Sequence, residues 1–145
     1  MKNDHETKER LLVCAREEFL EKGYQKASLR SICKKAGVTT GALYFFFQDK
    51  EDLFSAIVQP TLDQIREMAE QHVRQELMML QNLPGADKDN MHDDHNATEQ
   101  ILHVLYKNYD ICQMLLTNSQ GSRYENCLDE IVDLFENGQR ALAQE

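Results

Sequence analysis

Two short amphipathic segments joined by one glycine are the feature that most constrains the fold of this 145-residue chain. Ser28 can cap a helix that ends at Ala36, and Gly37 then supplies a tight turn. Thr39 can cap a second helix that runs through Phe47. Both segments carry apolar residues at helical spacing, so each is expected to bury one face and to leave the other to solvent. The sequence therefore predicts two short helices that meet at a glycine turn.

Helical periodicity also dominates the rest of the chain, and no strand pattern competes with it. The spacing predicts a first helix from Thr7 to Lys22, which stops at Gly23. A further helix starts at Asp49, and Pro60 is expected to kink or break it near Gln59. The prediction is an all-α protein of seven or eight helices without an internal repeat.

The second half of the chain contains one expected loop and three helix starts. Residues 83–96 hold Pro, Gly and four Asp, which is typical of an exposed and mobile loop. Capping patterns predict helices that begin at Asn96, near Asp110 and at Ser122. Gly138 is expected to weaken the last of them.

Charge is distributed unevenly along the chain, whose net charge is −9. Residues 59–145 carry six basic and sixteen acidic residues, whereas residues 22–50 carry six Lys and Arg and one acid, Asp49. A basic segment inside an acidic protein is expected for a DNA-binding head, although a solvated helix face gives the same pattern. The chain has no long apolar run and no signal-peptide core, so we expect a soluble cytoplasmic protein that does not bind membranes.

The parts of a helix-turn-helix occur here in the required order. Such a motif needs a small residue where the helices cross, a glycine in the turn, and apolar residues that hold the second helix so that its outer face can enter the major groove. These parts are supplied by Ile32, Cys33, Ala36, Gly37, Val38 and Leu43.

A longer string around this motif resembles a known family. It consists of Phe19 to Tyr24, Ser28, Ile32, Ala36-Gly37-Val38, Thr39 to Tyr44, Phe47 and Lys50 to Leu53. Over residues 7–58 it resembles the DNA-binding head of TetR-family transcriptional repressors. The resemblance implies a helix-turn-helix head over residues 1–50 and a helical ligand-binding and dimerisation body over residues 51–145. It also implies a homodimer that binds an inverted-repeat operator in duplex DNA and is released by a small-molecule ligand. Family members usually continue with long helices that pair in the dimer, and little after Gly138 replaces them, so the chain is expected to be short at its C-terminal end.

The resemblance also assigns residues that contact DNA. They are Thr39, Thr40, Gly41, Ala42 and Tyr44 on the recognition helix and Lys50 at the next helix start. Thr40, Gly41 and Ala42 allow close approach to base edges, including a thymine methyl group. Tyr44, Lys50, the Ser28 helix end and Arg30 suit phosphates. Alternatively, Tyr44 is a half-buried packing residue and Lys50 is a solvated charge. Phe46 stands where the family commonly has a His, so it cannot donate a hydrogen bond to phosphate.

Methionines and tyrosines of the second half suit an adaptable apolar cavity, although residues at such spacing more often form the core. The candidate ligand-pocket residues are Met68, Met79, Leu105, Tyr106, Tyr109, Met114 and Tyr124. A pocket follows mainly from the family resemblance, and the acidic body then favours a small apolar or cationic effector.

Neither a metal nor a cofactor is expected. The segment His92-Asp93-Asp94-His95 holds four ligand-type residues, but an acidic loop explains them without a metal. The cysteines are widely spaced and are expected to be reduced and mostly buried; they are Cys14, Cys33, Cys112 and Cys127.

An enzyme is not indicated, because the chain has no phosphate-binding glycine loop, nucleophile elbow or zincin motif. The alternative to a DNA-binding regulator is an all-helical protein-interaction module that keeps the fold without binding an operator. Phe46 and the acidic balance favour that alternative, and the basic segment around Gly37 favours the regulator.

Overall fold

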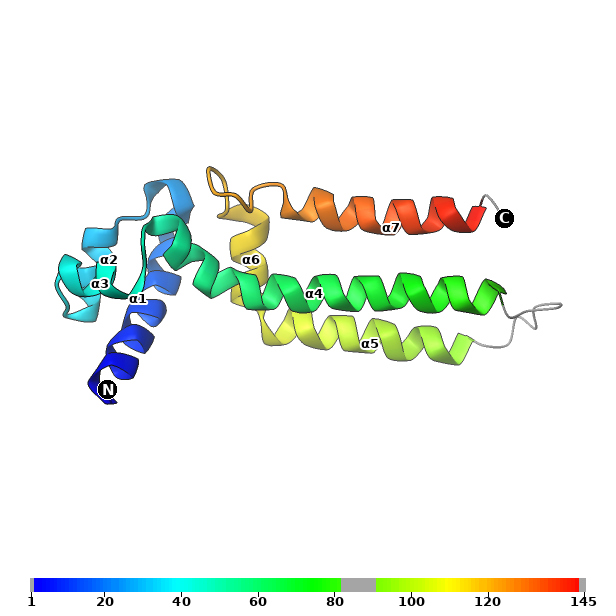
Figure 1. The fold of residues 1–145 in the computed structure, drawn as a ribbon, viewed down its shortest axis with the longest axis horizontal. Helices are drawn as coiled ribbons and strands as arrows, with labels where there is room; N and C mark the ends of the chain where they lie inside the picture. Colours follow the sequence, from blue (N-terminus) through cyan, green and yellow to red (C-terminus); the bar gives the residue numbers. More distant parts are fainter. Residues whose placement is uncertain (1, 82–90, 144–145) are drawn as a thin grey trace. The chain divides into compact units, whose positions relative to one another are not determined.

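The computed structural model describes residues 2–81 and 91–143, and within these ranges it contains seven helices and no strand (Figure 1). The predicted all-α class is confirmed. The helices are α1 (Lys2–Lys26), α2 (Leu29–Ala36), α3 (Thr40–Phe46), α4 (Lys50–Gln81), α5 (Met91–Lys107), α6 (Tyr109–Thr117) and α7 (Cys127–Ala143). None of the helices in the described ranges is long and apolar enough to cross a membrane.

These helices form two compact units that do not follow chain order. Unit 1 comprises the chain up to Pro60 together with Asp110–Asn126. Unit 2 comprises Thr61–Tyr109 and the chain from Cys127 onward. Unit 1 thus includes most of α6 and the segment after it, in addition to α1, α2, α3 and the start of α4.

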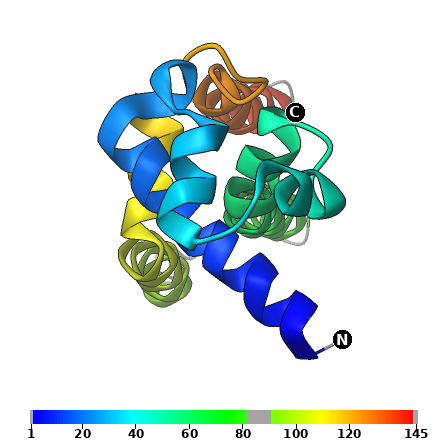
Figure 2. The same cartoon turned by 90° about the vertical axis from the view of Figure 1, so that its left-hand side faces the viewer.

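Unit 1 is built around α1, α2 and α3, which contact one another. Figure 2 looks at this end of the chain, with α1 in dark blue and α2 and α3 in lighter blue against it. Apolar side chains from all three helices and from α4 are fully buried, among them Leu11, Phe19, Ile32, Leu43 and Phe54. Phe19 and Phe54 pack edge to face with ring centroids 4.8 Å apart, an arrangement that favourably pairs the ring quadrupoles.

The segment after α6 is fastened to α1 at the point where that helix is interrupted. Gly23 has φ 74° and ψ 164°, so the backbone leaves the helical conformation there, as predicted. Asn118 donates from Nδ2 to the carbonyl oxygens of Phe19 (3.2 Å) and Leu20 (3.1 Å), and its own carbonyl accepts from Tyr24 N–H at 2.8 Å. Asn118 therefore satisfies backbone groups that the end of a helix leaves without intrahelical partners.

The predictions for α4 and α5 hold only in part. α4 is not broken at Pro60, because it continues through this residue to Gln81, and the boundary between the two units falls there. A kink near Gln59 stays a prediction. The predicted loop is shorter than expected, since Met91 to Asn96 already belong to α5 and the helix does not start at Asn96. The remainder of that loop, residues 83–90, lies outside the described residues.

The last helix also differs from its prediction. It begins at Cys127 and not at Ser122, which lies in the preceding turns. Gly138 lies inside this helix and is buried, and a Cβ at this position would lie 2.7 Å from Cγ1 of Val73 on α4. This glycine therefore permits the close approach of α7 to α4 within unit 2.

Polar contacts also join the helices of unit 2, which run side by side in Figure 1. Arg66 of α4 forms an ion pair with Glu130 of α7. Thr61 Oγ1 donates to Oδ1 of Asn108 at 3.4 Å, which links α4 to the residue that follows α5.

Candidate nucleic-acid interface

A left-handed glycine joins α2 to α3. Gly37 has φ 66° and ψ 33°, a conformation that costs residues with a side chain about 1 kcal/mol or more. Val38 N–H donates to the carbonyl of Cys33 at 3.0 Å, which closes the end of α2. The predicted caps are confirmed, because Ser28 accepts from Ser31 N–H at 3.4 Å and Thr39 accepts from Ala42 N–H at 3.2 Å. Local interactions thus define both helices and the turn between them.

The buried faces of α2 and α3 hold the pair against α1. Ile32, Cys33 and Ala36 of α2 are buried, as are Leu43 of α3 and Phe47 directly after it. Of the apolar residues predicted for a helix-turn-helix, these include Ile32, Cys33, Ala36 and Leu43, whereas Val38 is half-buried.

A fully buried carboxylate ties α1 to α2. Glu18 of α1 is 0% exposed, and it accepts from Lys22 Nζ (2.7 Å), from Ser31 Oγ (2.9 Å) and from the backbone N–H of Ser28 (3.4 Å). Lys35 at the end of α2 forms an ion pair with it at 3.1 Å. Burial alone would raise the pKa of Glu18, but these hydrogen bonds lower it to about 2. The carboxylate is therefore ionised and has partners from both helices.

The outer face of α3, which we define as Thr40, Gly41, Tyr44 and Phe45, lies in solvent. Three of its members are spaced as i, i+3 and i+4, so they share one side of the helix. Tyr44 is 56% exposed and is thus not a packing residue in this structure. Ala42 is half-buried at the edge of this face, and the cap residue Thr39 is exposed beside its N-terminal end.

Three exposed cations flank the two helices. We call Lys26, Arg30 and Lys34 the basic cluster. Arg30 and Lys34 lie one helical turn apart on the exposed side of α2. Among the residues that the structure describes, none of the three forms an ion pair with a carboxylate, so their charges are available to an anionic partner.

A comparison with known families agrees with this geometry, because the profile described as "Bacterial regulatory proteins, tetR family" matches residues 11–57. Residues 11–57 thus form a TetR-type DNA-binding region. The matched range covers the core of α1, the whole of α2 and α3, and the first turns of α4.

Individual relatives of this chain carry the names of transcriptional regulators. The repressor BepR of Brucella suis is 47% identical over 53 residues, which are 37% of this chain and 25% of that protein. The regulator AcrR of Shigella flexneri is 48% identical over 52 residues, covering 36% and 24% of the two chains. The fatty acid metabolism regulator protein of Bacillus subtilis is 26% identical over 126 residues, covering 84% and 64%. This chain therefore spans about a quarter of the length of the first two relatives.

A solved structure is similar over most of the chain. It is a transcriptional regulator (TerR/AcrR family) from Aquifex aeolicus, with a TM-score of 0.61 and 28% sequence identity. The match covers 93% of this chain and 72% of that one. The TetR-type arrangement of an N-terminal helix-turn-helix followed by a helical body thus holds for this chain.

Lys50, which the family resemblance assigns to phosphate, is half-buried and has partners within unit 1. Its ammonium donates to the carbonyl oxygens of Gln25 (3.2 Å) and Ala27 (3.0 Å), and it lies 4.7 Å from the centre of the Tyr24 ring. Burial lowers the pKa of this ammonium. In this structure Lys50 joins the end of α1 to the start of α4, and its contact with phosphate stays a prediction.

Glu51, the residue after Lys50, bonds to the segment that follows α6. Glu51 accepts a hydrogen bond from the Tyr24 hydroxyl at 2.7 Å and from the backbone N–H of Arg123 at 3.0 Å. Burial and the contact with Glu51 raise the pKa of Tyr24. Tyr124, the next residue, is buried and donates its hydroxyl to Gln59 at 2.5 Å. The segment from Arg123 is thus part of the support for α1 and α4 within unit 1.

The candidate effector residues are divided between the two units. Met114 and Tyr124 are buried in unit 1, whereas Met68, Leu105, Tyr106 and Tyr109 belong to unit 2. Tyr106 and Tyr109 are 87% and 66% exposed. The side chain of Met79 lies outside the described residues. An effector pocket made by this set stays a prediction.

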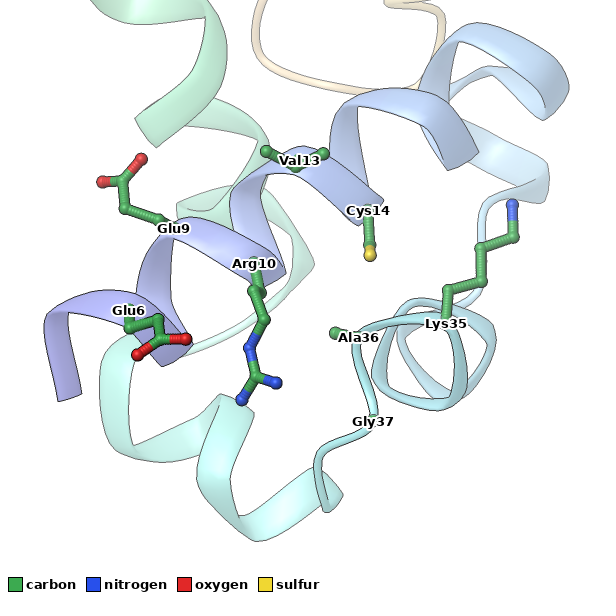
Figure 3. A pocket seen from close by; sticks show the side chains of 8 residues that line it. All are labelled: Glu6, Glu9, Arg10, Val13, Cys14, Lys35, Ala36 and Gly37. Carbon is green, nitrogen blue, oxygen red and sulfur yellow. The ribbon is translucent and has the colours of Figure 1, made fainter. Parts of the chain in front are cut away.

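Two shallow cavities lie in the described parts of the chain. One, of about 460 Å³ in unit 1, lies where Arg10 and Cys14 of α1 point toward Lys35 and the Gly37 turn (Figure 3). The other, of about 450 Å³ in unit 2, is lined by Gln64, Met68, Glu99, Gln100, His103 and Val104. Of the predicted effector residues whose side chains are described, only Met68 lines the second cavity.

In the described ranges, no thiol has a lowered pKa and no cluster of metal-ligating residues occurs. Burial raises the pKa of all four thiols, and the carboxylate of Glu17 adds to this at Cys14. No three His, Cys, Asp or Glu residues lie close enough to hold a metal among the residues described. The side chains of His92 to His95 lie outside this description.

The sequence reasoning missed two residues that the structure brings into the site. Phe45 belongs to the outer face of α3, and its spacing of four residues from Gly41 was the available signal. Glu18 looked like one of many charges on the first helix, and no local pattern distinguishes it from Glu17 or Glu21. Its role depends on Ser31 and Lys35, which only the folded chain brings beside it.

Proposed function

We propose that this TetR-family chain is a cytoplasmic transcriptional repressor that binds an inverted-repeat operator in duplex DNA as a homodimer. Thr39, Thr40, Gly41 and Ala42 contact base edges, and Tyr44, Arg30 and the Ser28 helix end contact phosphates. The observation that carries this proposal is the left-handed turn at Gly37, which joins α2 to α3 while the outer face of α3 stays in solvent.

Charge and shape both support a nucleic-acid partner. The basic cluster contributes three exposed positive charges beside α3, in a chain whose overall charge is −9. Gly41 has no side chain, and a Cβ at this position would meet only Thr39 Oγ1, at 3.8 Å, so a duplex can approach the helix backbone closely. Phosphate contacts position such a helix, and base-edge contacts provide its sequence preference.

The direct test is selection of bound sites from a random duplex pool, followed by affinity measurements at several salt concentrations. We expect an enriched inverted repeat that Tyr44→Ala binds at least tenfold more weakly. Tyr106→Ala is the matched control, because it removes an exposed tyrosine from α5 of unit 2. Equal loss in both variants, or no enrichment by a folded protein, would refute the proposal.

Salt dependence tests the basic cluster separately. Each phosphate contact adds about 0.9 to the slope of log affinity against log salt concentration. Arg30→Gln and Lys34→Gln are therefore each expected to reduce the slope by about 1, whereas Lys107→Gln on α5 should leave it unchanged. A slope that none of these changes alters would contradict a phosphate role for the basic cluster.

Release by a small molecule is the regulatory part of the proposal. The cavity of unit 2 combines the apolar side chains Met68 and Val104 with the carboxylate of Glu99, which suits a small apolar or cationic effector. We expect a lipophilic cation to weaken operator binding more than its neutral isostere does, and Glu99→Gln to remove the difference. Preferential release by an anionic analogue would contradict this assignment.

The second candidate is a protein-interaction module, and the exposed apolar side chains of α5 favour it. Leu102 and Tyr106 lie one turn apart on that helix, and each is more than half exposed. Tyr109, the first residue of α6, is also more than half exposed. A folded chain that enriches no duplex would favour this function over the regulator.

A further inference from the structure

Phe45 is the most exposed large hydrophobic residue that the structure describes in unit 1, with 75% of its surface accessible. It lies on the outer face of α3, beside Tyr44 and one helical turn after Gly41. Exposure of a phenylalanine ring to water is not compensated by hydrogen bonds, because the ring can neither donate nor accept a conventional one. Its exposure is therefore consistent with a surface that an apolar group of a partner covers.

The ring of Phe45 is braced by a row of aromatic residues that reaches the core. Phe45 packs edge to face on Phe46, with ring centroids 5.0 Å apart and planes at 86°. Phe46 is half-buried and lies 6.4 Å from the ring of Phe47, which is buried. Edge-to-face aromatic pairs are favourable beyond the area they bury. Phe46, which replaces the usual His of the family, thus supports the neighbouring ring in place of a phosphate contact.

The major groove offers one apolar group that such a ring can recognise. Base edges there present hydrogen-bond donors and acceptors, and thymine adds a C5-methyl group with which Ala, Thr and Phe side chains make contact. Arg30 and Lys34 of the basic cluster place positive charge on the adjacent helix α2, so the phosphates of the same duplex have partners there.

We propose that Phe45 contacts the C5-methyl group of a thymine in each half-site of the operator and thereby selects thymine at that position. This inference rests on the proposed DNA-binding function and specifies its sequence preference. Phe46 is a positioning residue in it, because it holds the ring of Phe45 without reaching the base.

Replacing thymine by deoxyuridine tests the contact, since this change removes the methyl group and preserves every hydrogen-bonding group. After the operator has been selected, each thymine of one half-site is replaced in turn. At one position we expect the native protein to lose about fourfold in affinity, the loss that corresponds to one buried carbon group. Phe45→Ala should bind the unmodified operator more weakly and show no further loss at that position.

A matched variant separates this contact from general effects on unit 1. Leu116→Ala removes an exposed apolar side chain from α6, in the same unit, and it should retain the native sensitivity to deoxyuridine. Thermal unfolding should give native midpoints for both variants, because both side chains are exposed. Phe46→Leu should retain part of the sensitivity, since it removes the ring that braces Phe45.

The outcomes distinguish this inference from the proposed function. Operator binding by the native protein without sensitivity to deoxyuridine at any position would overturn the thymine contact and leave the DNA-binding function in place. A weaker Phe45→Ala that keeps the native sensitivity would also overturn it, because the ring would then contact sugar or another group. Failure of the folded native protein to bind any duplex would overturn both.

Discussion

Replacement of Glu18 by glutamine tests whether a buried ion cluster holds the helix-turn-helix against α1. The change preserves the shape of the side chain and removes the charge that Lys22, Lys35 and Ser31 share. A pKa that falls from 4.5 to about 2 on folding corresponds to about 3 kcal/mol at neutral pH, because a tenfold change in an ionisation constant is worth about 1.4 kcal/mol. Since Lys22 and Lys35 are 37% and 36% exposed, water screens part of this attraction. We therefore expect a loss of about 2 kcal/mol.

The assay is urea unfolding followed by circular dichroism, with Glu21→Gln as the control. Glu21 lies one turn from Glu18 on the same helix and pairs with the same Lys35, but its side chain is 64% exposed. The control is expected to lose less than about 0.5 kcal/mol. Equal losses in the two variants would refute the reasoning that burial makes the Glu18 cluster important.

The pH dependence of stability follows from the same carboxylate. A group whose pKa is lower in the folded state stabilises the protein above its ordinary pKa of 4.5, and this contribution is lost as the pH falls toward about 2. The native free energy of unfolding should thus fall more steeply over this range than that of Glu18→Gln. Parallel curves for the two proteins would contradict the assignment.

Three further substitutions probe other contacts. Gly37→Ala is expected to lower the free energy of unfolding in urea by about 1–2 kcal/mol, because alanine must adopt φ 66° although no atom lies within 4 Å of the new Cβ. The control Gly41→Ala, inside α3, should be neutral or stabilising by up to about 1 kcal/mol. Equal effects of the two changes would contradict a strained turn at Gly37. Gly138→Ala should lower the thermal midpoint, since its Cβ would lie 2.7 Å from Val73 Cγ1, and Val73→Ala in the same chain should restore part of the loss; additive losses would show that the two positions do not touch. Asn118→Ala removes two hydrogen bonds to the carbonyls of Phe19 and Leu20 and is expected to cost about 1–2 kcal/mol in thermal unfolding, whereas the exposed Gln113→Ala should cost less than about 0.5 kcal/mol.

Two residues that disfavour helices lie inside helices of this structure. Pro60 lacks a backbone N–H, yet α4 continues through it to Gln81. Gly138 is a poor helix former, yet it lies inside α7 because Val73 leaves no room for a larger residue. In the second case, packing between two helices outweighs the intrinsic preference of one residue.

The amino-acid sequence by itself determined the all-α class, the two short helices and the turn between them. Ser28, Gly37 and Thr39 act on atoms only a few residues away, so their caps and the positive φ can be read from local order. The pattern of residues around this turn also sufficed to indicate the TetR family, which the profile match supports.

The tertiary structure alone decided which charged and aromatic residues remain available to a partner. Lys50 and Lys34 are both lysines of the basic segment, but the first is bound to the carbonyls of Gln25 and Ala27 and the second lies in solvent. The exposure of Phe45 and the burial of Phe47 likewise depend on how α3 packs on α1 and α2. Such differences arise from contacts between segments distant in the chain, and a local pattern carries no information about them.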